Sequence, residues 1–144
     1  MVEEILTVFL ICCSSFIGPE TGIHDGELNY CPPTPNCVSS QSWKWNVIHH
    51  IKPFRYNGLT RDEAFQKLKN LLDKKENVKI MTAKNYYIRT YYFTKVLRLP
   101  DRVEFLFSED SPTVQIRSTS MFGIWDIFHN RIRMEYIRHE LNWE

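Results

Sequence analysis

The stretch RVEFLFSEDSPTVQIRSTS, residues 102–120, decides the fold of this 144-residue chain. Both halves alternate apolar and polar side chains, and the apolar positions of one face are Val103, Phe105, Phe107, Val114 and Ile116. A period of two is typical of a β-strand with one buried face. Because the turn signal Asp110-Ser111-Pro112 separates the halves, the stretch predicts two antiparallel strands, 102–108 and 113–120.

Two more strands are predicted on the N-terminal side of this pair, at 78–82 and 86–97. The turn signals Lys84-Asn85 and Pro100-Asp101 separate them from each other and from the strand at 102. Four consecutive strands with short connections favour an antiparallel meander.

Helices are predicted on both sides of the meander. Thr60 and Glu63 form a capping box, and the apolar stripe that follows consists of Ala64, Phe65, Leu68, Leu71 and Leu72, with an end near Asn77. A closing helix from Asp126 has the stripe Ile127, Met134, Ile137 and Leu141, which Phe128, Ile132 and Tyr136 widen.

The expected fold is therefore an α+β two-layer sandwich, with an antiparallel sheet of four or more strands and two helices on one face. The length suits one domain, and 43% hydrophobic and 14% aromatic residues suffice for a core. Eighteen basic and seventeen acidic residues give a net charge of +1, which argues against nucleic acid as a partner.

The N-terminal part divides into two segments. Residues 5–17 are apolar except for Thr7, Ser14 and Ser15, a run too short to span a bilayer as a helix and similar in length to the core of a signal peptide. We therefore expect a leader or membrane-attachment segment at 1–18, an extended proline-rich arm at 19–57, and the α+β core at 58–144. The predicted location is exported or membrane-associated. A buried N-terminal segment in a cytoplasmic protein is the alternative.

Cys31 and Cys37 bracket the stiff loop Pro32-Pro33-Thr34-Pro35-Asn36. A local disulfide is the first interpretation, and it agrees with an oxidising compartment. A metal site shared with His24, His49 or His50 is a second possibility, and two reduced thiols a third. The spacing of the cysteines is not that of a known zinc motif, so no metal or cofactor is expected.

A second group of polar residues stands at the end of the last strand and the start of the closing helix. Arginine, hydroxyl groups and exposed helix amides together suit a carboxylate or phosphate. The candidate ligand residues are Arg117, Ser118, Ser120, Asp126, Asn130 and Arg131.

An internal structural role is the alternative for this group. Asp126 would then cap the helix and pair with Arg117 or Arg131, while the serines satisfy backbone groups. Asn130 falls on the apolar stripe, so it should be buried and hydrogen-bonded to the arm near Asn36 and Ser39.

These two motifs, the Cys-Pro-Pro-Thr-Pro-Asn-Cys loop and Arg117-Ser118-Thr119-Ser120 with Asn130-Arg131, resemble the DUF1499 family over about residues 28–141. Family members usually show R-S-x-S-R-x-G followed by D-x-G-x-N-R, and this chain differs at Met121 and Phe128. The missing arginine at 121 weakens any anion site that the resemblance implies. Members are often exported or membrane-associated, in bacterial envelopes or plastids, and the resemblance implies no catalytic residue.

The outer sheet face is a third candidate surface, formed by Tyr87, Arg89, Tyr91, Glu104, Gln115 and Arg117 if the strand parities hold. It could stack bases or sugars, but the neutral net charge favours a face covered by the arm, with Trp43 and Trp45.

The sequence thus favours a binding or scaffold module whose partner is an envelope or membrane protein or a small anionic ligand. The alternative is a hydrolase or transferase that holds an anionic substrate with Arg117 and Arg131 and uses Asp126 or a histidine as the base.

Overall fold

The computed structural model of the protein describes residues 20–95, 97–121 and 128–144. Its elements, in chain order, are β1 (Ile23–His24), β2 (Glu27–Leu28), β3 (Cys37–Ser39), β4 (Phe54–Arg55), α2 (Arg61–Asp73), β5 (Val78–Lys84), β6 (Tyr87–Phe93), β7 (Pro100–Phe107), β8 (Thr113–Thr119) and α3 (His129–Leu141).

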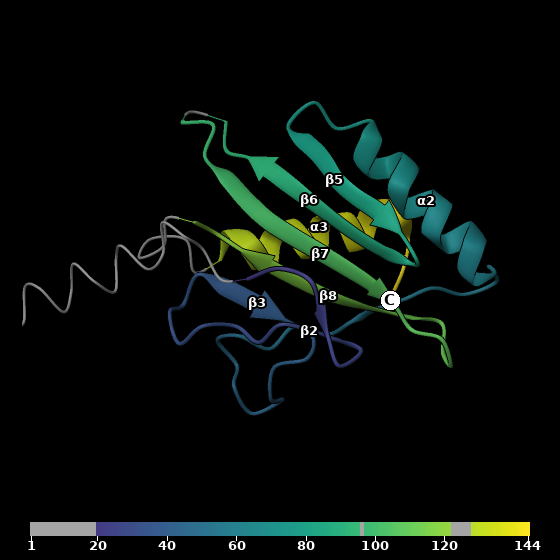
Figure 1. The fold of residues 1–144 in the computed structure, drawn as a ribbon, viewed down its shortest axis with the longest axis horizontal. Helices are drawn as coiled ribbons and strands as arrows, with labels where there is room; N and C mark the ends of the chain where they lie inside the picture. The colour runs from purple at the N-terminus through teal and green to yellow at the C-terminus, as the bar shows by residue number, and fades with distance from the viewer. Residues whose placement is uncertain (1–19, 96, 122–127) are drawn as a thin grey trace, which may run out of the picture.

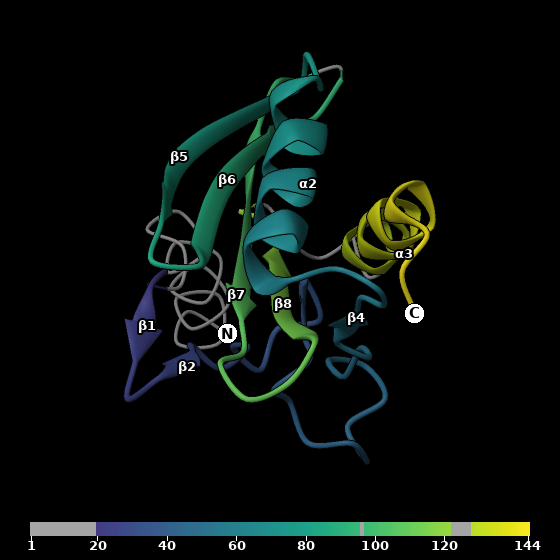
Figure 2. The ribbon, with the colours of Figure 1, turned by 90° about the vertical axis from the view of Figure 1, so that its right-hand side faces the viewer.

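One antiparallel sheet of six strands forms the centre of the molecule. Its order is β3-β8-β7-β6-β5 (Figure 1). β4 pairs with β8 along the same edge as β3. Seen edge-on, α2 and α3 lie on one side of the sheet and the small β1–β2 hairpin lies on the other (Figure 2). The α+β fold with two helices on one face is confirmed, and β3 and β4 from the arm enlarge the predicted four-stranded sheet.

The hydrophobic core lies between the sheet and the helices. The strands contribute the alternating positions of β7 and β8, and the helices contribute Ala64, Phe65, Leu68, Leu72, Met134, Ile137 and Leu141. Full burial of one such Leu or Phe side chain stabilises the fold by about 1.5–3 kcal/mol. The alternation seen in the sequence is therefore what attaches both helices to the sheet.

The capping box at the start of α2 is present as predicted. The Thr60 hydroxyl accepts from the Glu63 amide at 3.2 Å, and the Glu63 carboxylate accepts from the Thr60 amide at 2.7 Å. The Thr60 hydroxyl also donates to the Glu63 carboxylate at 2.9 Å, and the two bonds that this carboxylate accepts, from the Thr60 amide and hydroxyl, lower the pKa of Glu63. The helix ends at Asp73, earlier than the predicted Asn77.

The turn between β6 and β7 differs from the sequence prediction. β6 ends at Phe93, and Pro100 begins β7 opposite it, so Pro100-Asp101 is strand and not turn. Proline is tolerated as the first residue of a strand. Thr94 closes the turn instead, because its amide donates to the Leu99 carbonyl and its hydroxyl accepts from the Leu99 amide, both at 3.0 Å.

Several apolar side chains expected to cover the core are exposed. Phe128, Ile132 and Tyr136 were expected to widen the stripe of α3, but all three side chains are exposed. Trp43 and Trp45 do not cover the outer sheet face, since 69% and 77% of their surfaces are exposed. The outer face is covered by a different part of the arm.

Candidate functional site

The predicted site residues on and next to β8 lie on opposite faces of the sheet. Successive side chains of a strand alternate, so Arg117 lies on the outer face and Ser118 on the helix face. All four residues from Arg117 to Ser120 are buried. The candidate ligand residues therefore form two separate polar clusters rather than one site.

The first cluster, on the outer face, is a buried ion pair between Arg117 and Glu104. The two residues are register partners on β8 and β7, and Arg117 Nη1 lies 2.6 Å from Glu104 Oε2. Both side chains are at most 1% exposed. The other carboxylate oxygen accepts from the Tyr87 hydroxyl at 2.6 Å and from the Gly22 amide at 2.7 Å. Both carboxylate oxygens of Glu104 therefore accept hydrogen bonds from the protein.

The arm closes over this ion pair. Arg117 also donates to the backbone carbonyls of Glu20 and Tyr30, at 3.2 Å and 3.4 Å. Arg89, which faces Glu104 from β6, donates to the Thr21 hydroxyl at 3.0 Å. Residues 20–30 of the arm therefore cover Arg89, Glu104 and Arg117 on the outer face of the sheet.

The Tyr87 side chain is buried in this cluster, next to Glu104. Burial and the neighbouring Glu104 carboxylate raise the pKa of its phenol far above the usual value, and burial is the larger cause. The neutral phenol is a hydrogen-bond donor, which is the form that the carboxylate requires. The Tyr87 phenol therefore stays neutral in the folded protein and donates to Glu104.

The second cluster surrounds Asn130, in the first turn of α3. Its amide nitrogen donates to the Asn36 carbonyl at 3.0 Å and to the Ser120 hydroxyl at 2.8 Å. Its amide oxygen accepts from the Ser118 hydroxyl at 2.6 Å and from Arg133 at 2.9 Å. All four hydrogen-bonding positions of the amide are therefore used. The predicted burial of Asn130 and its contact with the arm are confirmed at Asn36.

Arg133 extends this cluster to β7. Its guanidinium donates to the Ser118 hydroxyl at 2.9 Å and forms an ion pair with Asp101, and it lies over the Tyr92 ring. Asp101 was not among the predicted site residues, because Pro100-Asp101 resembles a turn in the sequence. The period of two in a strand could have indicated its position, because Asp101 lies two residues before the inward-facing Val103 and therefore shares its face.

Arg131 has a different role from Arg133. It donates to three backbone carbonyls of one loop, those of Val47 at 3.1 Å, Ile48 at 3.3 Å and His50 at 2.7 Å. It therefore binds the loop that follows β3 and does not face Arg117. Asp126, the remaining candidate, lies outside the described residues.

A disulfide joins Cys31 and Cys37, whose Cα atoms are 5.6 Å apart. Cys37 begins β3 and pairs with Thr119 of β8, so the bond fixes the proline-rich loop to the sheet edge. The Cys37 carbonyl accepts from His49 Nδ1 at 2.9 Å. Across residues 20–95, 97–121 and 128–144, no group of three or more histidine, cysteine or acidic side chains is arranged to hold a metal ion.

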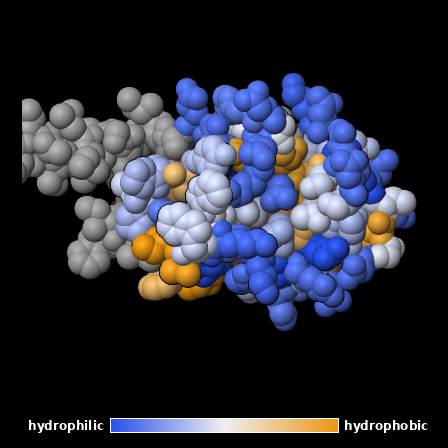
Figure 3. Space-filling view, turned by 90° about the horizontal axis from the view of Figure 1, so that it is seen from below, coloured by the Kyte–Doolittle hydropathy of each residue, from blue (hydrophilic) through white to orange (hydrophobic). Residues whose placement is uncertain are grey.

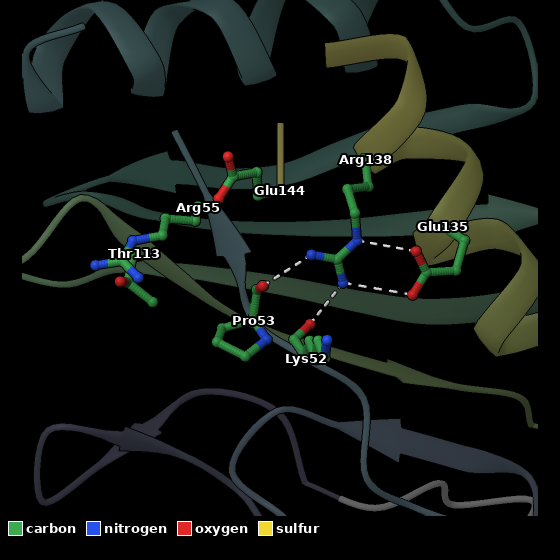
Figure 4. A pocket seen from close by; sticks show the side chains of 7 residues that line it. All are labelled: Lys52, Pro53, Arg55, Thr113, Glu135, Arg138 and Glu144. Atoms are coloured by element: carbon green, nitrogen blue, oxygen red, sulfur yellow. Dashed lines mark hydrogen bonds and ion pairs between the residues drawn. The ribbon is translucent and has the colours of Figure 1, made fainter. Parts of the chain in front are cut away.

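A surface pocket of about 590 Å³ lies near the other end of β8, between β4 and α3. Figure 4 shows Arg138 reaching into it, paired with Glu135 and donating to the carbonyls of Pro53 at 2.8 Å and Lys52 at 2.7 Å. The Arg138 guanidinium is thus engaged by the protein itself. The pocket contains none of the residues predicted from the sequence.

The geometry defines an α+β domain whose two polar motifs tie an N-terminal arm and a C-terminal helix to one sheet. The chain belongs to the DUF1499 family, described as a protein of unknown function, whose family profile matches residues 27–141. Neither a curated protein nor a solved structure gave a significant match. Within the part of the chain that the structure describes, neither helix has the length and apolar character needed to cross a membrane.

Proposed function

We propose that this DUF1499 domain is an exported or membrane-associated module that works by binding or scaffolding. The disulfide between Cys31 and Cys37 carries the proposal, because such bonds persist in oxidising compartments and are rare in the cytosol. The apolar run at residues 5–17 agrees with export or attachment to a membrane.

The contacts of the motif residues favour a scaffold over a catalytic centre. Arg117 is fully buried and its guanidinium already holds Glu104, so an anionic substrate would have to displace an internal carboxylate. Asn130 has no hydrogen-bonding position left for a ligand. A hydrolase or transferase that uses Arg117 therefore has less support than a domain whose motifs hold its own arm.

The test is the redox state of the native protein. The full chain is alkylated without reductant and then digested after glutamate, which releases the fragment 28–63 with Cys31 and Cys37 but without Cys12 and Cys13. The proposal expects an unalkylated fragment that gains two alkyl groups only after reduction. Intact mass in the same experiment reads any N-terminal processing. Two alkylated thiols in the native, unprocessed protein would contradict export.

A further inference from the structure

The loop between β3 and β4 carries a row of exposed apolar side chains. Trp43 and Trp45 are exposed as described above, and Val47 and Ile48 expose 78% and 51% of their surfaces. Figure 3 shows apolar side chains gathering at one end of the lower face of the molecule. Four large apolar residues within six positions form a surface of the kind that marks an interaction site.

The base of this loop is held firmly. The Ser39 amide donates to the His49 carbonyl at 2.8 Å, and the His50 ring bonds the Ser42 carbonyl at 2.9 Å. Arg131 clamps three carbonyls of the same loop from α3. The exposed side chains are therefore presented on an ordered backbone, which lowers the entropy lost on binding.

The sequence around this loop contains basic residues but no acidic ones. From Leu28 to Arg61 the chain contains no aspartate or glutamate, although it has seventeen acidic residues in total. Lys44 lies within the apolar row, between the two tryptophans, and Lys52 follows the row; both are exposed. The loop segment 42–48 therefore combines tryptophan, aliphatic and lysine side chains and has no acidic residue of its own. Lys52, by contrast, lies beside Glu135 and Glu144 in the pocket between β4 and α3.

We infer that the loop formed by residues 42–48 docks onto a bilayer surface that contains anionic lipids. Tryptophan prefers the boundary between headgroups and acyl chains, Val47 and Ile48 supply apolar area, and lysine is attracted to anionic headgroups. The inference rests on the proposed function, in that it names the partner of a membrane-associated module. It assigns binding to this loop and not to the polar motifs.

The first experiment uses the intrinsic fluorescence of the full chain. Vesicles of phosphatidylcholine and phosphatidylglycerol are prepared with and without bromine on the acyl chains, which quenches tryptophan at that depth. The inference expects quenching in the wild type and loss of most of it in the double variant Trp43→Phe/Trp45→Phe, because the remaining Trp125 and Trp143 are common to both proteins. Pelleting with vesicles but no quenching from these two positions would overturn the inference.

The second experiment measures partitioning on the same vesicles. Trp43→Ser/Trp45→Ser should weaken binding by tenfold or more, estimated roughly from the apolar area withdrawn from water. Lys44→Gln should weaken it about fivefold on anionic vesicles and leave binding to pure phosphatidylcholine unchanged. Leu97→Ser is the matched control, because Leu97 is 72% exposed in the β6–β7 turn and should leave partitioning unchanged.

The outcomes separate this inference from the proposed function. An intact disulfide in a protein that shows neither quenching nor partitioning would refute the bilayer as partner while leaving the exported module in place. Equal losses in Leu97→Ser and the tryptophan variant would also refute it, because the effect would then be general hydrophobicity. Circular dichroism and thiol mapping of each variant confirm that the fold and the disulfide are retained.

Discussion

Replacing Arg117 by alanine should destabilise this domain more than any surface substitution. The change leaves Glu104 buried with only Tyr87 and the Gly22 amide as donors. Removing one partner of a buried ion pair costs about 3–5 kcal/mol. Because a domain of this size has about 5–15 kcal/mol of stability in total, the melting temperature should fall by about 10–15 °C.

Urea unfolding followed by circular dichroism measures this loss. The matched control is Lys69→Ala, which removes an exposed ion pair to Asp73 at 3.0 Å on α2 and should cost about 0.5 kcal/mol or less. The double variant Glu104→Gln/Arg117→Met removes both charges and should recover part of the loss. If Arg117→Ala destabilises the protein no more than Lys69→Ala does, the ion pair does not hold the arm and the reasoning fails.

Three further predictions concern other parts of the two clusters and the helix cap. Asn130→Ala should lower the free energy of unfolding by about 2–3 kcal/mol, because it leaves buried partners unpaired, whereas exposed Asn70→Ala should change it little; urea unfolding tests both. Because the folded state raises the pKa of Tyr87, its contribution should be complete below pH of about 10 and disappear as the pH rises through the folded value. Tyr87→Phe should accordingly reduce the alkaline loss of stability in a pH series of melts. Thr60→Ala should cost about 1 kcal/mol, and the capping interaction of Glu63, whose pKa is lowered, should weaken as acid protonates it.

The sequence predicted the sheet and helices because their signals are local. Alternation in β7 and β8, the apolar stripe of α2 and its capping box each depend on residues within one element. The end of β6 was wrong because Pro100 resembled a turn residue. Only the pairing of Phe93 with Pro100 shows that the chain had already turned.

The polar residues were harder to place because their partners are distant in the sequence. Alternation already indicated that Arg117 and Ser118 face opposite sides, and it placed Glu104 on the face of Arg117. The neutral net charge also favoured cover of that face by the arm, but nothing local in the sequence indicated that residues 20–30 provide it, since the Gly22 amide meets a carboxylate 82 residues away. The exposure of Trp43 was missed for the same reason: which part of the arm covers the sheet depends on long-range packing.

The residues of the two family motifs hold different parts of the fold together. Arg117 binds the arm on one face of β8, and Ser118 and Ser120 join Asn130 to the arm and α3 on the other. The disulfide at Cys37 fixes the strand from which the loop at 42–48 leaves, and Arg131 fixes the far side of that loop. Substitutions in the motifs should therefore act mainly through stability, whereas substitutions at the exposed tip of the loop should change binding in a protein that remains folded. A motif variant that keeps its melting temperature but loses vesicle binding would show that the two roles are not separate.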